Sequence, residues 1–496
     1  MGNLTVNQLK HAALIDRAGE ALSSLESAMD RTYRLGYHLM PPAGWMNDPN
    51  GLIQFQGVYH AFYQHDPYQS KQGPMHWGHA TSLDLVHWEH QPVALAPSET
   101  YDSGPAGGQG CWSGSAVDDN GTLTLIYTGH VDGRSPEEVQ SLAVSVDGIV
   151  FNKPDQNPVI EDSPDRERFG FRDPKVWKRG ELWYMAVGYG KDGLGKAIIY
   201  TSENLRVWTY RGAALESDGT MGDMWECPDL FPIGGGEHHA LLISPMNTGS
   251  YKNLYVTGRF DYEACRLEKG YAELIDYGFD FYAPQTLLDD QGRRIMLAWM
   301  NIWGAVAPEQ ELGWYGAMTL PRELTLEADG TLRSRPVKEL EVLRGEAVQA
   351  SGIVLRDGEP AGVAGVAGQQ LELIARIRPG DASEVGLRFF ASADGEAYAE
   401  IVYDVAGGKL SMDRSRAGAG DGGVSVAPLS LLSDGTIELR LYLDRSSAEL
   451  FANDGRIAMT NRIYGKADQT GISFVARGGE AELVSLDSWR LNGIWG

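Results

Sequence analysis

Three acidic residues lie at nearly the same point of a repeated segment. Asp48, Asp173 and Glu226 come nine, seven and ten residues before a glycine that opens an apolar stretch, and each is followed by Pro or by Cys-Pro. Two carboxyl groups that flank a glycosidic bond can act as a proton donor and as a nucleophile or base. Singly, each residue could be a turn former, an ion-pair partner or a surface residue. Their shared position in the repeat favours an acidic active site.

The repeat itself predicts the fold. Five segments consist of a glycine turn followed by an apolar or aromatic strand, and a second element, of the form Ser-Leu-Asp-Leu-Val-His-Trp, recurs downstream of three of them. The five glycines are Gly57, Gly121, Gly180, Gly236 and Gly292. Five hairpin-bearing units at this period indicate an all-β protein with a five-bladed β-propeller. A β-sandwich with coincidental turn spacing is the alternative.

The segments before and after the repeat have other sequence patterns. Apolar residues at helical spacing predict an amphipathic helix over residues 6–30, within a short helical extension at 1–35. The propeller is expected at 36–335 and a charged linker at 336–349. From 350 to 496, short alternating strands with Gly/Asp turns predict a C-terminal β-sandwich.

Composition excludes several classes of partner. The chain has 496 residues and a formal net charge of −25, which disfavours nucleic acid and anionic membranes as partners. No apolar run is long enough for a transmembrane helix, and charged residues interrupt any signal-peptide core near the N-terminus. Only three cysteines occur, which favours a reducing compartment. We therefore expect a cytoplasmic protein without a disulfide framework. The sequence leaves open whether it forms a homo-oligomer.

In a propeller the innermost strands line the central channel, so equivalent positions of the blades converge at one mouth. Carboxylates brought together there repel one another, and at least one pKa must rise. Aromatic side chains near these positions could stack on sugar faces, although core packing is their commoner role. These aromatic residues are Trp45, Trp77, Trp112, Trp225 and Trp299.

The motifs around these residues resemble those of glycoside hydrolase family 32, which includes invertases, sucrose-6-phosphate hydrolases, levanases and inulinases. Trp-Met-Asn-Asp-Pro-Asn-Gly at 45–51, Phe-Arg-Asp-Pro at 171–174 and Trp-Glu-Cys-Pro at 225–228 look like its three acidic motifs, in the same order. Supporting similarities are Met-His-Trp-Gly-His-Ala at 75–80, Trp-Ser-Gly-Ser at 112–115, Asp-Phe-Tyr-Ala-Pro-Gln-Thr at 280–286, Leu-Pro-Arg-Glu-Leu at 320–324 and Asp-Arg-Ser-Ser-Ala-Glu-Leu-Phe at 444–451. The resemblance spans nearly the whole chain and implies a five-bladed propeller followed by a β-sandwich.

The resemblance also implies roles for individual residues. Asp48 would be the nucleophile, Glu226 the general acid and then base, and Asp173 a stabiliser of the transition state. Substrate-binding residues would be Asn47, Gln64, Trp77, Ser113 and Arg172, with Trp112 and Trp299 as further aromatic contacts. The implied chemistry is a retaining hydrolysis through a fructosyl-enzyme intermediate that needs no metal and no cofactor.

One position departs from the family pattern. The residue before Gly-Pro-Met-His-Trp is usually Trp, at the rim of the pocket, whereas here it is Gln72, preceded by Lys71. Gln72 would therefore lie at the rim as a polar contact to the leaving group. Loss of the aromatic wall leaves the leaving-group preference open, and Lys71 could favour a phosphate.

The expected function is therefore that of a β-fructofuranosidase, with sucrose, sucrose 6-phosphate or short fructo-oligosaccharides as its sugar substrates. Two other functions fit parts of the sequence. An arabinan-type hydrolase shares the five blades and three carboxylates, although the motif at 45–51 argues against it. A non-catalytic propeller that binds sugar or protein would show no turnover.

Overall fold

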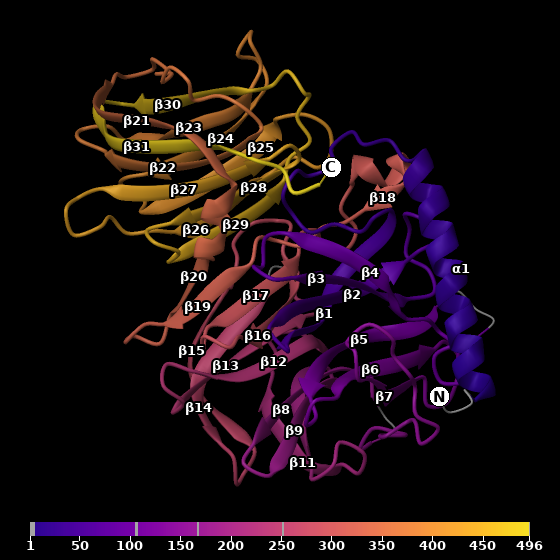
Figure 1. The fold of residues 1–496 in the computed structure, drawn as a ribbon. Helices are drawn as coiled ribbons and strands as arrows, with labels where there is room; N and C mark the ends of the chain where they lie inside the picture. Colours follow the sequence, from indigo (N-terminus) through magenta and orange to yellow (C-terminus); the bar gives the residue numbers. More distant parts are fainter. Residues whose placement is uncertain (1–4, 105–107, 166–167, 250–251, 496) are drawn as a thin grey trace.

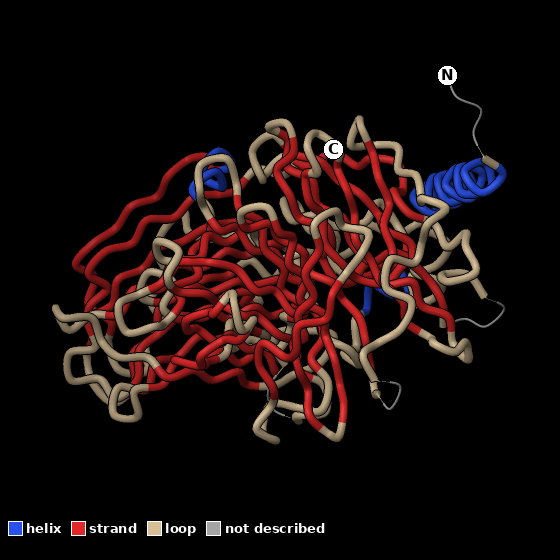
Figure 2. The backbone as a smooth tube through the Cα atoms, turned by 90° about the horizontal axis from the view of Figure 1, so that it is seen from below, coloured by secondary structure: helices blue, strands red, loops and turns tan. Residues whose placement is uncertain are grey.

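The computed structural model describes residues 5–104, 108–165, 168–249 and 252–495. Figure 1 shows two β domains, the propeller in indigo to salmon and the sandwich in orange to yellow, with helix α1 along the outer edge of the propeller. Strands dominate both domains in Figure 2, where helix is confined to α1 (Val6–Ala28) and to two short 3-10 turns, η1 (Pro308–Leu312) and η2 (Lys338–Leu343). The expected all-β architecture with an N-terminal helix is confirmed.

The N-terminal domain contains five antiparallel sheets, one for each repeat unit, as the sequence predicts. The first blade consists of β1 (Gly44–Phe55), β2 (Val58–Asp66), β3 (His76–Ser82) and β4 (Trp88–Leu95), with β18 (Trp314–Tyr315) added in parallel beside β1. The second contains β5 (Gln109–Asp118), β6 (Leu123–Val131) and β7 (Glu138–Ser145). The third contains β8 (Gly170–Arg179), β9 (Leu182–Lys191), β10 (Leu194–Ser202) and β11 (Thr209–Glu216). The fourth contains β12 (Trp225–Ile233), β13 (His238–Pro245), β14 (Leu254–Asp261) and β15 (Arg266–Glu273). The fifth contains β16 (Tyr282–Leu288), β17 (Arg294–Trp299), β19 (Arg322–Leu326) and β20 (Leu332–Pro336).

Each repeat glycine lies in the hairpin turn that joins the first and second strands of its blade. All five have positive φ, from 59° at Gly180 to 93° at Gly236, and a Cβ at any of them would point into open space. The requirement is therefore conformational, because only glycine adopts this left-handed geometry without cost. The second recurring element is also a turn. Asp84, Asp147 and Asn204 each accept two backbone N–H bonds from the residues two and three positions later.

The first strands of the blades close the ring. Strands β1, β5, β8, β12 and β16 each contact the next, and β16 contacts β1. Apolar clusters fill the spaces between neighbouring blades; Trp225, for example, packs between the third and fourth. The site-bearing strands are therefore held from both sides by packed cores, which is what precise positioning of side chains requires.

The C-terminal domain is a sandwich of two antiparallel sheets around one apolar core. One sheet has the order β21 (Arg344–Leu355), β31 (Ala481–Leu491), β22 (Gln370–Arg378), β27 (Ile437–Asp444), β28 (Ser447–Ala452) and β29 (Ile457–Arg462). The other has the order β26 (Val424–Pro428), β25 (Lys409–Arg416), β24 (Tyr398–Asp404), β23 (Glu384–Ala391) and β30 (Gly471–Arg477). Strand β21 begins at Arg344, inside the range 336–349 that the sequence assigned to a linker, and η2 occupies the part before it.

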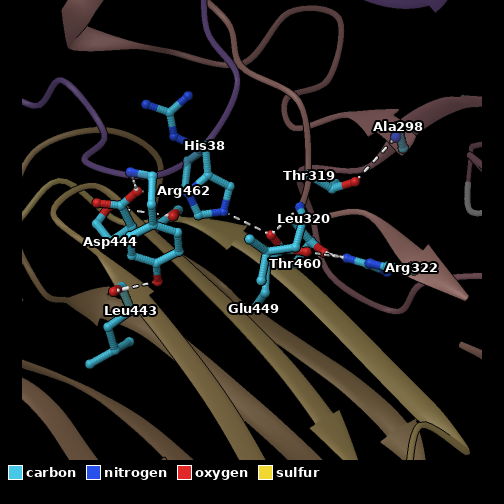
Figure 3. A network of polar contacts seen from close by, with 12 residues as sticks. His38, Ala298, Thr319, Leu320, Arg322, Leu443, Asp444, Glu449, Thr460 and Arg462 are labelled. Carbon is cyan, nitrogen blue, oxygen red and sulfur yellow. Dashed lines mark hydrogen bonds and ion pairs between the residues drawn. The ribbon is translucent and has the colours of Figure 1, made fainter. Parts of the chain in front are cut away.

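A buried polar network joins the two domains (Figure 3). Arg322 of the propeller lies between Asp276, at 2.8 Å, and Glu449 of the sandwich, at 2.5 Å. His38 contacts Asp444 through Nδ1 at 2.7 Å and Glu449 through Nε2 at 3.0 Å. Burial alone would lower the pKa of His38, but hydrogen bonds to these two carboxylates raise it to about 9. His38 is therefore a cation at neutral pH and links the N-terminal segment to the sandwich.

Helix α1 packs on the outside of the first blade, beside β4, and lies at the edge of the molecule in Figure 2. It begins at a capping box in which Thr5 and Gln8 bond to each other's backbone N–H. Only His11 and Ala18 are buried, and Ala96 donates its backbone N–H to His11 Nε2 at 3.1 Å. No helix in the described part of the chain is long and apolar enough to cross a membrane.

Candidate active site

The candidate catalytic residues lie on the innermost strands, at irregularities in their pairing. In each blade the register between the first and second strands shifts, at Met46/Pro49, Trp112/Gly114, Arg172/Lys175, Glu226/Asp229 and Tyr282/Gln285, and the first blade has a second shift at Asn50/Ile53. A bulge re-aims the side chain that it carries. The same bulge in every blade therefore directs Asp48, Ser113, Asp173 and Glu226 toward one mouth of the channel.

Three of the bulges contain a strained residue. Asp173, Cys227 and Ala283 have φ values of 65°, 48° and 50°, and each precedes a proline. A left-handed conformation at a residue other than glycine costs on the order of 1–3 kcal/mol and persists where the surrounding structure enforces it. One of these residues is the acidic Asp173 itself, and Cys227 directly follows Glu226.

Asp48 is buried and accepts two polar hydrogen bonds. Asn47 Nδ2 donates to Oδ1 at 3.1 Å, and Ser113 Oγ donates to Oδ2 at 3.0 Å. Asn47 is oriented in turn by Trp45, whose Nε1 donates to its side-chain oxygen at 2.6 Å. Burial, followed by the negative charge of Glu226, raises the pKa of Asp48 to about 6 despite these donors. The carboxylate is thus ionised but incompletely solvated at neutral pH, which suits a nucleophile.

Asp173 lies beside Asp48, separated from it by the side chain of Cys227. Its Oδ2 accepts the backbone N–H of Cys227 at 2.9 Å, and its own backbone N–H donates to Thr128 Oγ1 at 3.0 Å. Burial and the charge of Glu226 raise its pKa, whereas Arg172 opposes the shift. The two hydrogen bonds fix the position of Asp173.

Glu226 is the most exposed of the three carboxylates, with 18% of its side chain accessible. Arg172 donates to Oε1 from Nε at 3.0 Å and from Nη2 at 2.9 Å, and the Tyr282 hydroxyl donates to Oε2. Both oxygens are therefore held, and Glu226 lines the same pocket as Asp48.

Arg172 is itself anchored by a buried acid that sequence reasoning did not identify. Glu138 accepts from Arg172 Nη1 at 2.9 Å and from the backbone N–H of Phe171. Burial would raise the pKa of Glu138, but the charge of Arg172 and hydrogen bonds from His130 and Phe171 lower it to about 2. Glu138 comes from β7, in the second blade, where no motif of the sequence marked it.

A pocket of about 80 Å³ collects most of the residues that the sequence analysis singled out. Its lining consists of Asn47, Asp48, Gln64, Gln72, Met75, Trp112, Ser113, Arg172, Asp173, Glu226 and Trp303. Gln64 is fixed by a bond from Nε2 to the carbonyl of Cys111 at 2.9 Å, and Trp112 stacks on His130 with ring centroids 3.6 Å apart.

Two of the expected binding residues do not line this pocket. Trp77 and Trp299 are fully buried. Trp77 packs against Phe62 and donates its Nε1 to the carbonyl of Trp112, and Trp299 packs against Trp45. Both support pocket residues from behind instead of offering a face to a ligand.

Another tryptophan supplies the aromatic wall at the rim. Trp303, which is 40% exposed, lines the pocket and stacks on Trp45 with centroids 6.0 Å apart and planes 23° apart. Its position in a loop after β17 gave no periodic signal that could have identified it. Gln72 lies on the pocket lining as well, but Lys71 does not, and its Nζ lies 3.9 Å from Glu311.

The chain is similar to known proteins over nearly its whole length. The glycosyl hydrolases family 32 N-terminal domain model matches residues 38–336, and the family's C-terminal model matches residues 339–490. A raffinose invertase from Escherichia coli is 42% identical over 96% of this chain and 98% of its own length. A sucrose-6-phosphate hydrolase from Zymomonas mobilis is 38% identical over 98% of this chain and 96% of its own. A family 32 beta-fructofuranosidase from Bombyx mori, solved as a mutant in complex with sucrose, superposes with a TM-score of 0.82 at 33% identity over 97% of this chain and 99% of that chain.

The family models match both domains and the relatives are similar over nearly the whole chain, so the chain belongs to glycoside hydrolase family 32 as an enzyme of the β-fructofuranosidase type.

Proposed function

We propose that this enzyme releases fructose from sucrose by a retaining, two-step hydrolysis. The observation that carries the proposal is the convergence of Asp48, Asp173 and Glu226 on one pocket from three blades. A protonated acid and a separate nucleophile are what a retaining glycosidase requires.

In the first step, a carboxylate oxygen of Asp48 attacks the anomeric carbon of the fructosyl unit. Glu226 gives its proton to the glycosidic oxygen, the bond between that oxygen and the anomeric carbon breaks, and glucose leaves. In the second step, Glu226 takes a proton from water, whose oxygen attacks the same carbon and releases Asp48. Asp173 stabilises the positive charge that develops on the ring, because its carboxylate is held nearby in a site from which water is largely excluded.

The leaving group is proposed to be neutral. The described pocket lining contains one cation, Arg172, and this guanidinium is already engaged by Glu226 and Glu138. Lys71, the residue that could have favoured a phosphate, points to Glu311 in solvent, where a charge contact is weak. The relatives named above include both an invertase and a sucrose-6-phosphate hydrolase, so similarity alone does not choose between the two substrates.

The test is kcat/KM for sucrose, sucrose 6-phosphate and a short fructo-oligosaccharide on the purified full-length protein. We expect sucrose to be hydrolysed at least as efficiently as its phosphate ester. Lys71→Gln should leave the ratio of the two kcat/KM values unchanged within about twofold, because an exposed charge contributes little to binding. A strong preference for the phosphate ester that Lys71→Gln abolishes would overturn the neutral leaving group and leave the fructosidase mechanism intact. Release of fructose from none of the three would overturn the mechanism as well.

We also propose that the enzyme works in the cytoplasm. The proposal is supported by its cysteines, because Cys111, Cys227 and Cys265 are all buried and unpaired in the described structure. Activity retained under an oxidant-free reducing buffer and found in the soluble interior fraction of the producing cell would agree with this location. Activity found only outside the cell would contradict it.

A further inference from the structure

A polar cleft lies at the boundary of the two domains, away from the site described above. It has a volume of about 620 Å³, and its lining includes Arg31, Arg34, His90, Gln370, Arg445 and Trp495, with Glu26 as its one acidic residue. In Figure 1 the segment after α1 crosses here, between the propeller and the sandwich, close to the C-terminal end of the chain. Arg445 belongs to the motif at 444–451, whose acidic members Asp444 and Glu449 join the domains through His38. The arginine of that motif has no part in this network.

Arg34 differs from the other buried arginines. The described structure contains five arginines that are at least nine-tenths buried, and four of them, Arg172, Arg322, Arg414 and Arg462, have a carboxylate within hydrogen-bonding distance. Arg34, which is 8% exposed, makes no direct ion pair with a carboxylate among the described residues, and the charge of Glu26 acts on it only from a distance. Its Nη1 donates to the carbonyl of Pro41 at 2.9 Å, and its guanidinium lies over the Trp314 ring. A buried cation without a counter-ion lowers the stability of the fold. The missing partner is notable because the chain has a net charge of −25 and many carboxylates.

The other two arginines of the cleft do not neutralise this charge but add to it. Arg445 donates from Nη1 to the carbonyl of Arg34 at 3.2 Å and from Nε to Gln370 Oε1 at 3.1 Å, and no ion pair of it occurs in the described structure. Its φ of 45° shows that the backbone is constrained where it presents this side chain. Arg31 lies 3.9 Å from Glu26, with both side chains about half exposed. Burial, followed by the positive charge of Arg31, lowers the pKa of Arg34 to about 10, so Arg34 remains a cation at neutral pH.

The chemistry of the cleft defines what it could hold. Guanidinium groups recognise phosphate through paired N–H donors, and several that converge on one space select a group with more than one negative charge. His90 and Trp495 stack with centroids 4.9 Å apart and planes 9° apart, and they give the cleft a flat apolar wall. The volume lies in the range of small-molecule sites.

We propose that this cleft binds the phosphate group of a small phosphorylated metabolite or of inorganic phosphate, with Arg31, Arg34 and Arg445 as its ligands. Arg31 and Arg34 come from the segment before the propeller, whereas Arg445 and Gln370 come from the sandwich. A bound phosphate bridges the two domains and therefore stabilises the folded chain, because it binds the native state and not the unfolded one. The proposal does not depend on the substrate of the enzyme.

The experiment measures binding to the full-length protein by calorimetry and by thermal shift at constant ionic strength. The probes are inorganic phosphate, glucose 6-phosphate and, as the uncharged counterpart, glucose. We expect saturable binding of at least one phosphate-bearing probe, a rise in Tm with its concentration, and no response to glucose. Equal affinity for the two phosphates identifies the phosphate group alone as the ligand, whereas tighter binding of glucose 6-phosphate shows that the sugar contributes.

Arg445→Gln is the diagnostic variant, because Arg445 is exposed and makes no ion pair whose loss would unfold the chain. We expect its Kd to rise at least tenfold, and Arg31→Gln to weaken binding as well. Arg356→Gln is the matched control, since Arg356 is an exposed arginine of the same domain that does not line the cleft. An equal response in Arg445→Gln and Arg356→Gln would overturn the proposal, as would phosphate binding that never saturates. Binding that survives Arg445→Gln but is lost in the presence of fructose would assign the phosphate to the pocket of Asp48 and would also overturn it.

Discussion

Asp48 and Asp173 lie on either side of a single sulfur atom. Cys227 Sγ is 3.4 Å from Asp48 Oδ2 and 3.6 Å from Asp173 Oδ2. A thiol carries one proton and is a weak donor, so it separates the two acids but cannot satisfy both. Burial and the charge of Glu226 raise the pKa of each aspartate above its usual range. The site thus concentrates negative charge that the fold must tolerate, and several consequences can be measured.

Removal of either reacting carboxylate should abolish turnover and leave the fold intact. We expect Asp48→Asn and Glu226→Gln each to lower kcat by about 10³-fold or more, because the proposed mechanism makes Asp48 the nucleophile and Glu226 the proton donor. Steady-state kinetics on sucrose and circular dichroism of the purified variants measure both effects. Glu181→Gln, an exposed acid of the third blade, is the control. Near-normal turnover in either site variant would show that the assigned roles are wrong.

The pH dependence should follow the ionisation of Asp48. Its pKa of about 6 means that kcat/KM falls tenfold per pH unit once the pH drops below that value, because the protonated carboxyl is not a nucleophile. Since the mechanism also needs a protonated Glu226, the full profile should be bell-shaped. Initial rates should be measured between about pH 4 and about pH 9, because this range covers both ordinary and raised carboxyl pKa values. A flat profile across that range would contradict the paired roles.

Asp48 should lower the stability of the folded protein at pH values at which its carboxylate is ionised. The folded-state pKa of Asp48 lies above the ordinary value of 3.8, so the native state loses stability as the pH rises from about 4 through about 6. Asp48→Asn should therefore raise the free energy of unfolding by on the order of 2 kcal/mol at pH 8 and have little effect at pH 4. Thermal melts at the two pH values test this. A variant that is less stable at pH 8 would show that the hydrogen bonds to Asp48 outweigh its desolvation.

Trp303 should determine how tightly the leaving group is held. An exposed aromatic face on the pocket wall contributes about 1 kcal/mol or more to the binding of a sugar ring. We expect Trp303→Ala to raise KM for sucrose roughly five- to tenfold with a smaller change in kcat, and Trp303→Phe to recover part of the loss. Gln72→Trp, which restores the aromatic residue usual at this position of the family, is the complementary variant. An unchanged KM in Trp303→Ala would remove Trp303 from the binding surface.

The domain boundary should weaken at alkaline pH. Since the pKa of His38 is raised from 6.5 to about 9 by Asp444 and Glu449, its contribution is fully present below pH 6.5 and is lost as the pH rises through 9. The loss is on the order of 3 kcal/mol, and this window is separate from that of Asp48. Tm measured from pH 6 to pH 10 should fall in the native chain, whereas His38→Gln should start lower and fall less. Parallel curves for the two proteins would show that His38 does not titrate in the folded state.

Much of the catalytic constellation could be predicted from residue order. The repeat glycines and the acidic residues before them predicted five blades and a shared mouth, because a propeller places equivalent positions side by side. The same argument could not tell which aromatic residues face the ligand. Trp77 and Trp299 stand near the motifs in the sequence, yet both are buried, and Trp303 provides the exposed ring. Within a strand, the face on which a side chain lies depends on the bulge, and no spacing in the sequence reports where a bulge falls.

The sequence by itself predicted the fold class and the two domains, and it singled out three carboxylates that the structure brings to one pocket. The five blades and the shared position of these acids could be read from turns that recur along the chain. Only the tertiary structure decided the electrostatics. Glu138 reaches Arg172 from another blade, His38 meets Glu449 across 411 residues, and Arg445 joins Arg34 across the domain boundary. The charge state of a buried group depends on how far it is removed from water and on which charges surround it, and both are properties of the folded chain.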